Sequence, residues 1–256
     1  MLPEYLIPFV WLSSAIIGVS VGATGIGGFL LPFILWAFLH LSVRDSLAVG
    51  FTAFTAGGII GTHFYWRNGH IDRRLTVYLS LGTLPGALLG SRLNLALPQE
   101  SVKVMLAVMV LLTSLYLLWS PRPIKKAIAG EPPPKAGPAT HHWLLFITGL
   151  VTGTGSSLTG VGGPLLVVPV LIAFQIPAHQ AVGVALFNSL IVSTAAGLVY
   201  LSHAAVSAAL VLPTTLAHAA GIALGAFISH RWSGLFLRQA IGWISLLSSL
   251  WILLQH

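Results

Sequence analysis

The chain has 256 residues, of which 56% are hydrophobic and only 7% are charged, and its formal net charge is +7. Soluble domains carry roughly 25% charged residues, so this composition excludes a water-soluble protein and indicates one whose solvent is lipid. The positive charge does not indicate a nucleic-acid partner, because the Lys and Arg residues lie between apolar runs, where they act as topology determinants.

Apolar residues form five segments, then a polar linker, then five further segments. The N-terminal repeat (1–119) contains segments 5–21, 29–41, 46–65, 76–97 and 101–119. The linker (120–142) is rich in Pro and basic residues and is expected to be an exposed hinge. The C-terminal repeat (143–256) contains segments 143–158, 164–176, 181–201, 206–228 and 235–254. The predicted fold class is all-α, a polytopic membrane protein with about 8–10 helical segments.

The two halves resemble each other at a nearly constant offset. A glycine-rich motif at residues 24–28 recurs at residues 159–163, a shift of 135 positions, and Gly86 and Gly90 recur as Gly221 and Gly225 at the same shift. The tripeptide Ala-Val-Gly at 48–50 recurs at 181–183 with a shift of 133. The chain is therefore a tandem repeat.

In both halves the second segment is short and follows the glycine motif. Thirteen helical residues would be about 20 Å long, less than the ~30 Å hydrocarbon core. Such short, glycine-interrupted segments at matching positions are typical of the discontinuous helices of secondary transporters. Each repeat is expected to hold a Gly-broken short helix or re-entrant hairpin plus three full spans.

Three spans after a hairpin invert the second half relative to the first, and the distribution of charge favours this arrangement. One face receives nine basic residues and the other three. Cytoplasmic loops are enriched in Lys and Arg, so the face with nine should be cytoplasmic, which puts the linker in the cytoplasm and both termini outside. The first set is Arg67, Arg73, Arg74, Arg122, Lys125, Lys126, Lys135, Arg231 and Arg238, and the second is Arg44, Arg92 and Lys103.

The glycine motifs are the first candidate binding residues. A helix that starts after each motif leaves N–H groups without internal partners and places positive dipole charge there, so it can bind an anion. The alternative is that the glycines only allow close helix packing. The candidates are Thr24, Gly25, Gly27 and Gly28 in the first copy and Thr159, Gly160, Gly162 and Gly163 in the second.

Polar residues in the third segment of each half are further candidates for substrate binding. These are Thr52 and Thr55 in the first half and Asn188 and Ser189 in the second, with Thr55 and Asn188 equivalent at the shift of 133. Facing a pseudo-two-fold axis, they could donate hydrogen bonds to one ligand, although hydrogen bonding between helices would explain them equally well.

The five acidic residues all fall at segment ends or in loops. A membrane interior without carboxylates argues against a cation substrate and suits an anion. His218 lies near the centre of a predicted span and is a possible proton relay, with a structural histidine as the alternative. The sequence has no Cys, and no metal site or cofactor is expected.

Several of these motifs together resemble the sulfite exporter TauE/SafE family. They are the two Thr-Gly-[Ile/Val]-Gly-Gly copies, each followed by Leu and Pro, the Ala-Val-Gly turn into a polar third segment, and Gly-x-x-x-Gly in the fourth. The resemblance implies a multi-pass carrier in the bacterial inner membrane that moves a small anionic sulfur compound such as sulfite, sulfoacetate or another organosulfonate, as an exporter or permease. Its expected partners are that anion and the lipid bilayer, with a homodimer possible and no nucleic acid.

Two other function classes remain open from sequence. An anion channel would share the topology and would differ by lacking saturable exchange. An intramembrane serine hydrolase could use Ser156 or Ser157 with His218, but the chain lacks a Gly-x-Ser-x-Gly elbow and a membrane-embedded carboxylate. An enzyme is therefore not expected.

Overall fold

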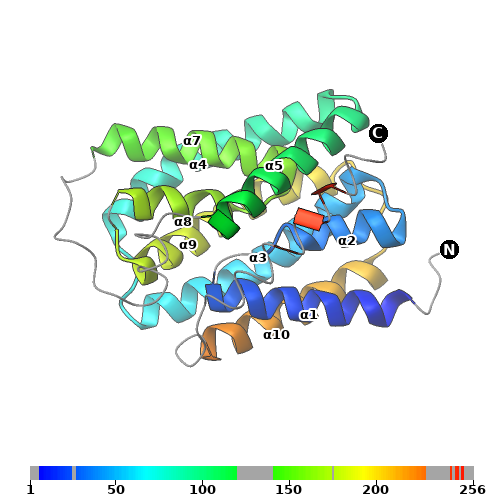
Figure 1. Cartoon of the computed structure of the whole chain (residues 1–256), viewed down its shortest axis with the longest axis horizontal. Coiled ribbons are helices and arrows are strands. Elements are labelled where there is room, and N and C mark those ends of the chain that lie inside the picture. The colour runs from blue at the N-terminus through cyan, green and yellow to red at the C-terminus, as the bar shows by residue number, and fades with distance from the viewer. Residues whose placement is uncertain are drawn as a thin grey trace.

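The computed structural model describes residues 6–24, 27–119, 141–174, 176–228, 243, 246, 247, 249 and 250, and within them the chain is helical without strands. In the view of Figure 1, α4 and α7 lie at the top of the bundle, α1 and α10 at the bottom, and α3, α8 and α9 between them. The all-α prediction is confirmed. The helices are α1 (Leu6–Thr24), α2 (Leu30–Leu39), α3 (Val43–Arg67), α4 (Arg73–Ala96), α5 (Gln99–Trp119), α7 (His142–Thr159), α8 (Gly163–Ala173), α9 (Ala178–Leu201) and α10 (Ala208–Ile228).

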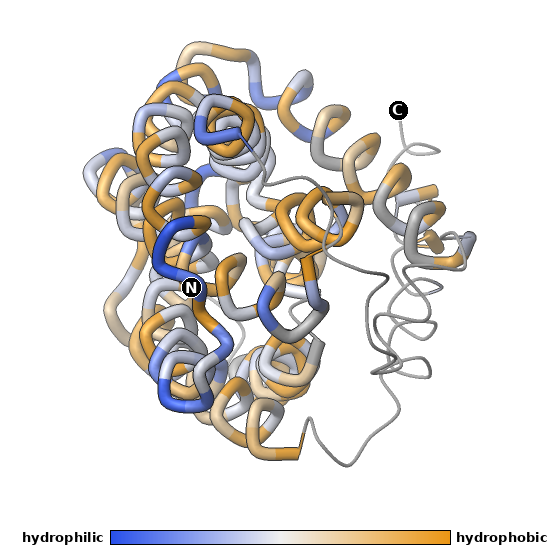
Figure 2. The backbone as a smooth tube through the Cα atoms, turned by 90° about the vertical axis from the view of Figure 1, so that its left-hand side faces the viewer, coloured by the Kyte–Doolittle hydropathy of each residue, from blue (hydrophilic) through white to orange (hydrophobic). Residues whose placement is uncertain are grey.

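The outside of the bundle exposes many large apolar side chains. Leu216 and Leu12 are 69% and 64% exposed, whereas the polar side chains of Thr83, Asn188 and His218 are buried. Figure 2 shows hydrophobic segments along the outer helices as well as within the bundle. Exposed leucines and buried polar groups are expected where lipid is the solvent.

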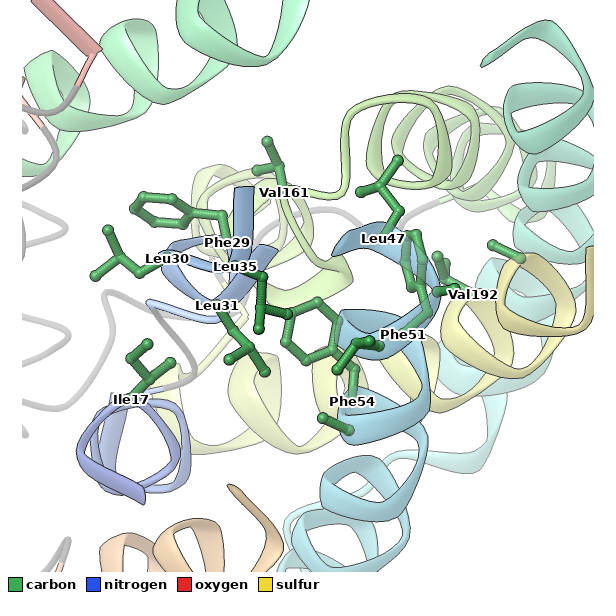
Figure 3. Close-up of a cluster of buried hydrophobic side chains, with 14 of the residues drawn as sticks. Ile17, Phe29, Leu30, Leu31, Leu35, Leu47, Phe51, Phe54, Val161 and Val192 are labelled. Atoms are coloured by element: carbon green, nitrogen blue, oxygen red, sulfur yellow. The ribbon is translucent and has the colours of Figure 1, made fainter. Parts of the chain in front are cut away.

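Three described helices are long and apolar enough to cross a membrane, namely Val43–Arg67, Gln180–Leu201 and Ala208–Ile228. Both short segments predicted from sequence form short apolar helices, α2 with 10 residues and α8 with 11. Figure 3 shows how α2 is held: Leu31 and Leu35 lie beside Phe54 and Phe51 of α3. The short helices are therefore supported by the third helix of their own half, since α8 likewise contacts α9.

The most extensive packing between helices joins the two halves of the sequence. Helix α1 packs on α10, α4 on α7, and α3 on α9. Helix α3 also contacts α10, and α9 contacts α4. This set of contacts is unchanged when each helix is replaced by its repeat equivalent, because α1, α3 and α4 correspond to α7, α9 and α10.

Residue contacts give the relative directions of these helices. Helices α3 and α9 are antiparallel, because Phe51 stacks on Tyr200 (ring centroids 5.6 Å apart) while Gly61 lies against Leu186. In the pairs α1 with α10 and α4 with α7, the helices are parallel. Ser14 Oγ donates to Thr214 O (3.0 Å) between α1 and α10, where Gly22 also faces Ile222.

Glycines allow the two parallel pairs to approach closely. A Cβ on Gly221 of α10 would lie 2.1 Å from Ala15 O of α1, and one on Gly86 of α4 would lie 2.4 Å from Leu150 O of α7. Since Gly86 and Gly221 are equivalent at the shift of 135, both halves use the same packing device. The Gly-x-x-x-Gly pattern of the fourth segment therefore forms a helix–helix contact, as small residues do in membranes.

Candidate functional site

Both glycine motifs form turns that only glycine adopts readily. Gly27 has φ +112° and lies just before α2. In the second copy, Gly160 ends α7 with φ +72° and Gly162 precedes α8 with φ +85°. Pro164 occupies the first turn of α8, where its missing N–H is not needed. Each motif thus places a positive-φ glycine directly before a short helix.

The two turns meet at one cavity. Around it lie the start of α2, the start of α8 and the middle of α3, α9 and α10. The free space in the cavity is only about 20 Å³, roughly enough for one water molecule. The cavity is lined by Val21, Gly27, Gly28, Phe54, Gly58, Val161, Gly162, Pro164, Leu165, Leu186, Ser189, His218 and Ile222.

The electrostatics of the cavity wall are compatible with an anion. The helix dipoles of α2 and α8 both place partial positive charge at the cavity. In the first turn of α2, the N–H groups of Leu30 and Leu31 donate to Gly27 O and Gly28 O (3.0 Å each). Among the described residues the carboxylates are distant, since Asp45 and Asp72 cap α3 and α4 and Glu100 pairs with Lys103. Nothing described in the wall would repel an anion.

His218 contributes the titratable side chain in the cavity wall. It is 0% exposed, its Nδ1 lies 3.2 Å from Ser14 O, and its Nε2 has no hydrogen-bond partner among the described residues. Phe54 lies against the ring with centroids 5.6 Å apart. A buried polar atom without a partner is costly, so Nε2 is poised to bond a ligand that enters.

The repeat equivalent of His218 is Thr83, at the shift of 135. Thr83 Oγ1 lies 3.4 Å from Gly149 O, and Gly149 is the equivalent of Ser14. The same hydroxyl also contacts the Asn188 amide, which is buried. Thr83 Oγ1 also donates to Leu79 O (2.9 Å) in its own helix, and neither Thr83 nor Asn188 lines the cavity. The two equivalent positions therefore both lie near an equivalent carbonyl but differ in the side chain, an imidazole at the cavity and a hydroxyl away from it.

Five of the residues singled out from sequence line the cavity together, namely Gly27, Gly28, Gly162, Ser189 and His218. Gly163 lies beside them, since a Cβ there would come 2.9 Å from Ser189 Cα. Gly25 and the Thr24 side chain lie outside the described residues.

The remaining candidates lie away from the cavity lining. The hydroxyls of Thr52, Thr55 and Thr159 donate to carbonyls one turn earlier in their own helices, at 2.8, 2.9 and 2.7 Å. Asn188 faces Thr83, and Gly160 faces Leu47. In this state these groups bond within or between helices.

Sequence reasoning missed most of the apolar lining. Phe54, Leu186 and Ile222 carry no signal in the sequence, because nothing distinguishes them from other apolar residues in their helices.

The residues that a serine hydrolase would need are not brought together. Ser157 Oγ donates to Thr154 O (3.2 Å) within α7, and α7 packs on α4. His218 lies in α10 against α1 and α3. The serine–imidazole hydrogen bond of such an enzyme is therefore not formed.

Comparison with known proteins finds a matching family and two similar membrane proteins. The family model described as "Sulfite exporter TauE/SafE" matches residues 10–253. The chain is 26% identical over 265 residues to "Probable membrane transporter protein YjnA" of Bacillus subtilis (strain 168), covering 93% of this chain and 96% of that protein. It is 25% identical over 241 residues to a "Probable membrane transporter protein" of Xylella fastidiosa, covering 86% and 84%.

No solved structure gives a significant match to the chain. The family model covers nearly all of it, however, and both relatives are aligned over most of their length. With its apolar exterior and its short helices opened by glycine turns, the chain belongs to the sulfite exporter TauE/SafE family of membrane transporters.

Proposed function

We propose that the chain is a secondary carrier that moves a small sulfur oxyanion, such as sulfite or an organosulfonate, across the bacterial inner membrane. The observation that carries the proposal is the cavity where two equivalent glycine turns, two helix N-termini and the unpartnered Nε2 of His218 meet without a carboxylate. The three oxygens of a sulfite or sulfonate group can accept several N–H bonds at once.

The dimensions of the cavity favour a carrier over a channel. A conducting pore needs a continuous wet path, whereas the free space between the two glycine turns is about that of one water molecule. Substrate would enter only after α2 and α8 move apart, as in a carrier that opens to one side at a time.

Transport in proteoliposomes tests the proposal. Purified protein should catalyse saturable flux of sulfite or an organosulfonate, and internal unlabelled substrate should accelerate entry by exchange. Thiosulfate, taurine and simple carboxylates complete the panel and define the substrate class. Flux that does not saturate would indicate a channel, and flux of none of the sulfur anions would contradict the proposal.

In the proposed orientation the two halves are inverted relative to each other, and the loop between α3 and α4 lies in the cytoplasm. The antiparallel packing of α3 and α9 supports it, as does the gathering of Arg67, Arg73 and Arg74 at one end of the bundle. The predicted cytoplasmic linker lies almost wholly outside the described residues.

Single cysteines can test this topology directly, because the chain has no native Cys. Asn68→Cys lies in the exposed loop between α3 and α4, and Ser202→Cys in the exposed loop after α9. An impermeant thiol reagent added to intact cells should label Ser202→Cys alone, and Asn68→Cys only after the membrane is opened. Labelling of both variants in intact cells would exclude inverted halves.

A further inference from the structure

The orientation of the His218 ring is set by a backbone carbonyl. Nδ1 lies 3.2 Å from Ser14 O, and a carbonyl oxygen can only accept a hydrogen bond. Nδ1 must therefore carry a hydrogen and donate it to Ser14. This leaves Nε2 as the ring atom that can gain or lose a proton, and the ring belongs to the cavity wall.

Neighbouring groups keep the ring in this position. Phe54 lies tilted against it, and Gly57 of α3 lies beside the ring edge, where a Cβ would come 3.4 Å from Cδ2. Among the described residues nothing bonds Nε2. Because His218 lines the cavity, a molecule that enters it can supply the missing hydrogen-bond partner.

Within the described helices around the cavity, no other titratable side chain faces the ring. Helices α1, α2 and α8 contain none between their ends, and His218 is the only one in α10. Those of α3 (Arg44, Asp45, His63, Tyr65 and Arg67) and Tyr200 of α9 lie near the helix ends and do not line the cavity. A proton on Nε2 therefore has no carboxylate partner in the cavity wall, and a buried charge without a partner is costly.

We propose that the site binds its anion together with one proton, which lies between His218 Nε2 and an oxygen of the anion. This inference rests on the proposed function and specifies the chemical form of its substrate. An anion that still carries an O–H, such as hydrogensulfite, donates that hydrogen to Nε2. A fully ionised organosulfonate offers only acceptors, so Nε2 must first take a proton from solution and then donate it.

Anion and proton then stabilise each other. The anion supplies the counter-charge that an imidazolium at this position lacks, and the proton supplies the donor that a sulfonate oxygen needs. By linkage, each raises the affinity for the other by the same factor. Uptake of an organosulfonate is accordingly accompanied by a proton.

Proton release or uptake on binding tests the inference without any variant. Detergent-solubilised wild-type protein in weak buffer with a pH indicator is mixed with methanesulfonate, or with sulfite at alkaline pH, where sulfite is a dianion. We expect uptake of about one proton per anion bound, as required by the linkage. Binding of either anion without proton uptake would overturn the inference but leave the proposed function intact.

Two histidine variants locate the proton. Gln at position 218 can donate a hydrogen bond but cannot titrate, so His218→Gln should bind methanesulfonate without proton uptake and with a flat pH dependence. His63→Gln, the same change at an exposed position of α3, should behave as wild type. Proton uptake that persists in folded His218→Gln would overturn the assignment. Wild-type protein that binds neither anion would instead contradict the proposed function, and this inference with it.

Discussion

Two of the interfaces between the halves, α1 with α10 and α4 with α7, use equivalent glycine contacts but differ in polar side chains. Each is a parallel pair brought together by glycines, with Gly221 and Gly86 at equivalent positions. At the next equivalent pair of positions, one interface holds His218 against Ser14 O and the other holds Thr83 against Gly149 O. Equivalent helix contacts thus carry different side chains, and of these two positions only His218 is titratable and lines the cavity.

The largest effect is expected for the packing glycines. Gly221→Ala and Gly86→Ala would place a Cβ 2.1 and 2.4 Å from carbonyl oxygens of the facing helix, so each pair must separate. We expect each variant to lose roughly 3 kcal/mol of folding stability, the upper range for overpacking, measured as thermal melting in detergent.

Gly155→Ala is the matched control for these packing variants. Its Cβ would approach only the Leu166 Cδ1, at 3.3 Å, a flexible side-chain end, and Ala favours a helix by about 1 kcal/mol over Gly. This variant should melt at or above the wild-type temperature. If Gly221→Ala is destabilised and Gly86→Ala is not, the two interfaces are not equivalent.

The glycine turns should show the next largest effect, on transport. Gly27→Leu and Gly162→Leu force a side chain into a positive-φ turn at the cavity, which costs about 1–3 kcal/mol in strain. At Gly162 a Cβ would meet nothing within 4 Å, so the protein should still fold while the side chain fills the site. Flux in proteoliposomes should fall at least tenfold, by about 1.4 kcal/mol or more.

Gly162→Ala separates strain from bulk in that experiment. It carries the same backbone penalty with one carbon, so its transport should lie between wild type and Gly162→Leu. Correctly inserted leucine variants that retain wild-type flux and affinity would rule out this cavity as the substrate site.

A smaller effect is expected at Thr83, the repeat equivalent of His218. Thr83→Val removes the hydroxyl that contacts the buried Asn188 amide, so it should reduce stability by about 1–3 kcal/mol. Proton uptake on anion binding should be unchanged, since His218 is intact. A change in proton stoichiometry in this variant would mean that the region around Thr83 also takes part in proton binding.

The smallest effect is expected at Thr55. Its hydroxyl donates to Phe51 O in its own helix, so Thr55→Val should change stability by no more than about 0.5 kcal/mol and should leave flux near wild type. A marked rise in KM would instead place Thr55 at the substrate, as the sequence repeat suggests.

Sequence alone located most helices to within a few residues. The short segment 164–176 corresponds to α8 (Gly163–Ala173), and 76–97 corresponds to α4 (Arg73–Ala96). The remaining differences arise at polar ends. Hydropathy ignores the first turn of α4, which begins earlier because the Asp72 carboxylate accepts from Leu75 N. Segment 235–254 falls largely outside the described residues.

The site was only partly predictable, for a physical reason. The repeat identified the glycine turns, because their positive φ restricts the residue type and so leaves a signature. Whether a hydroxyl faces a ligand or its own helix depends on side-chain rotation, and the hydroxyls of Thr52 and Thr55 bond backwards along α3. The pairing of α1 with α10 depends on contacts distant in sequence, which hydropathy does not encode.

Because α1 packs on α10 and α4 on α7, each of these closely packed pairs combines one helix from either side of the linker, held together by glycine contacts. In the proposed carrier, alternating access would move such mixed pairs against each other while the short helices open in turn. If either repeat were produced alone, the glycines that face the other repeat would be exposed to lipid. The two repeats would therefore have to be produced together to assemble.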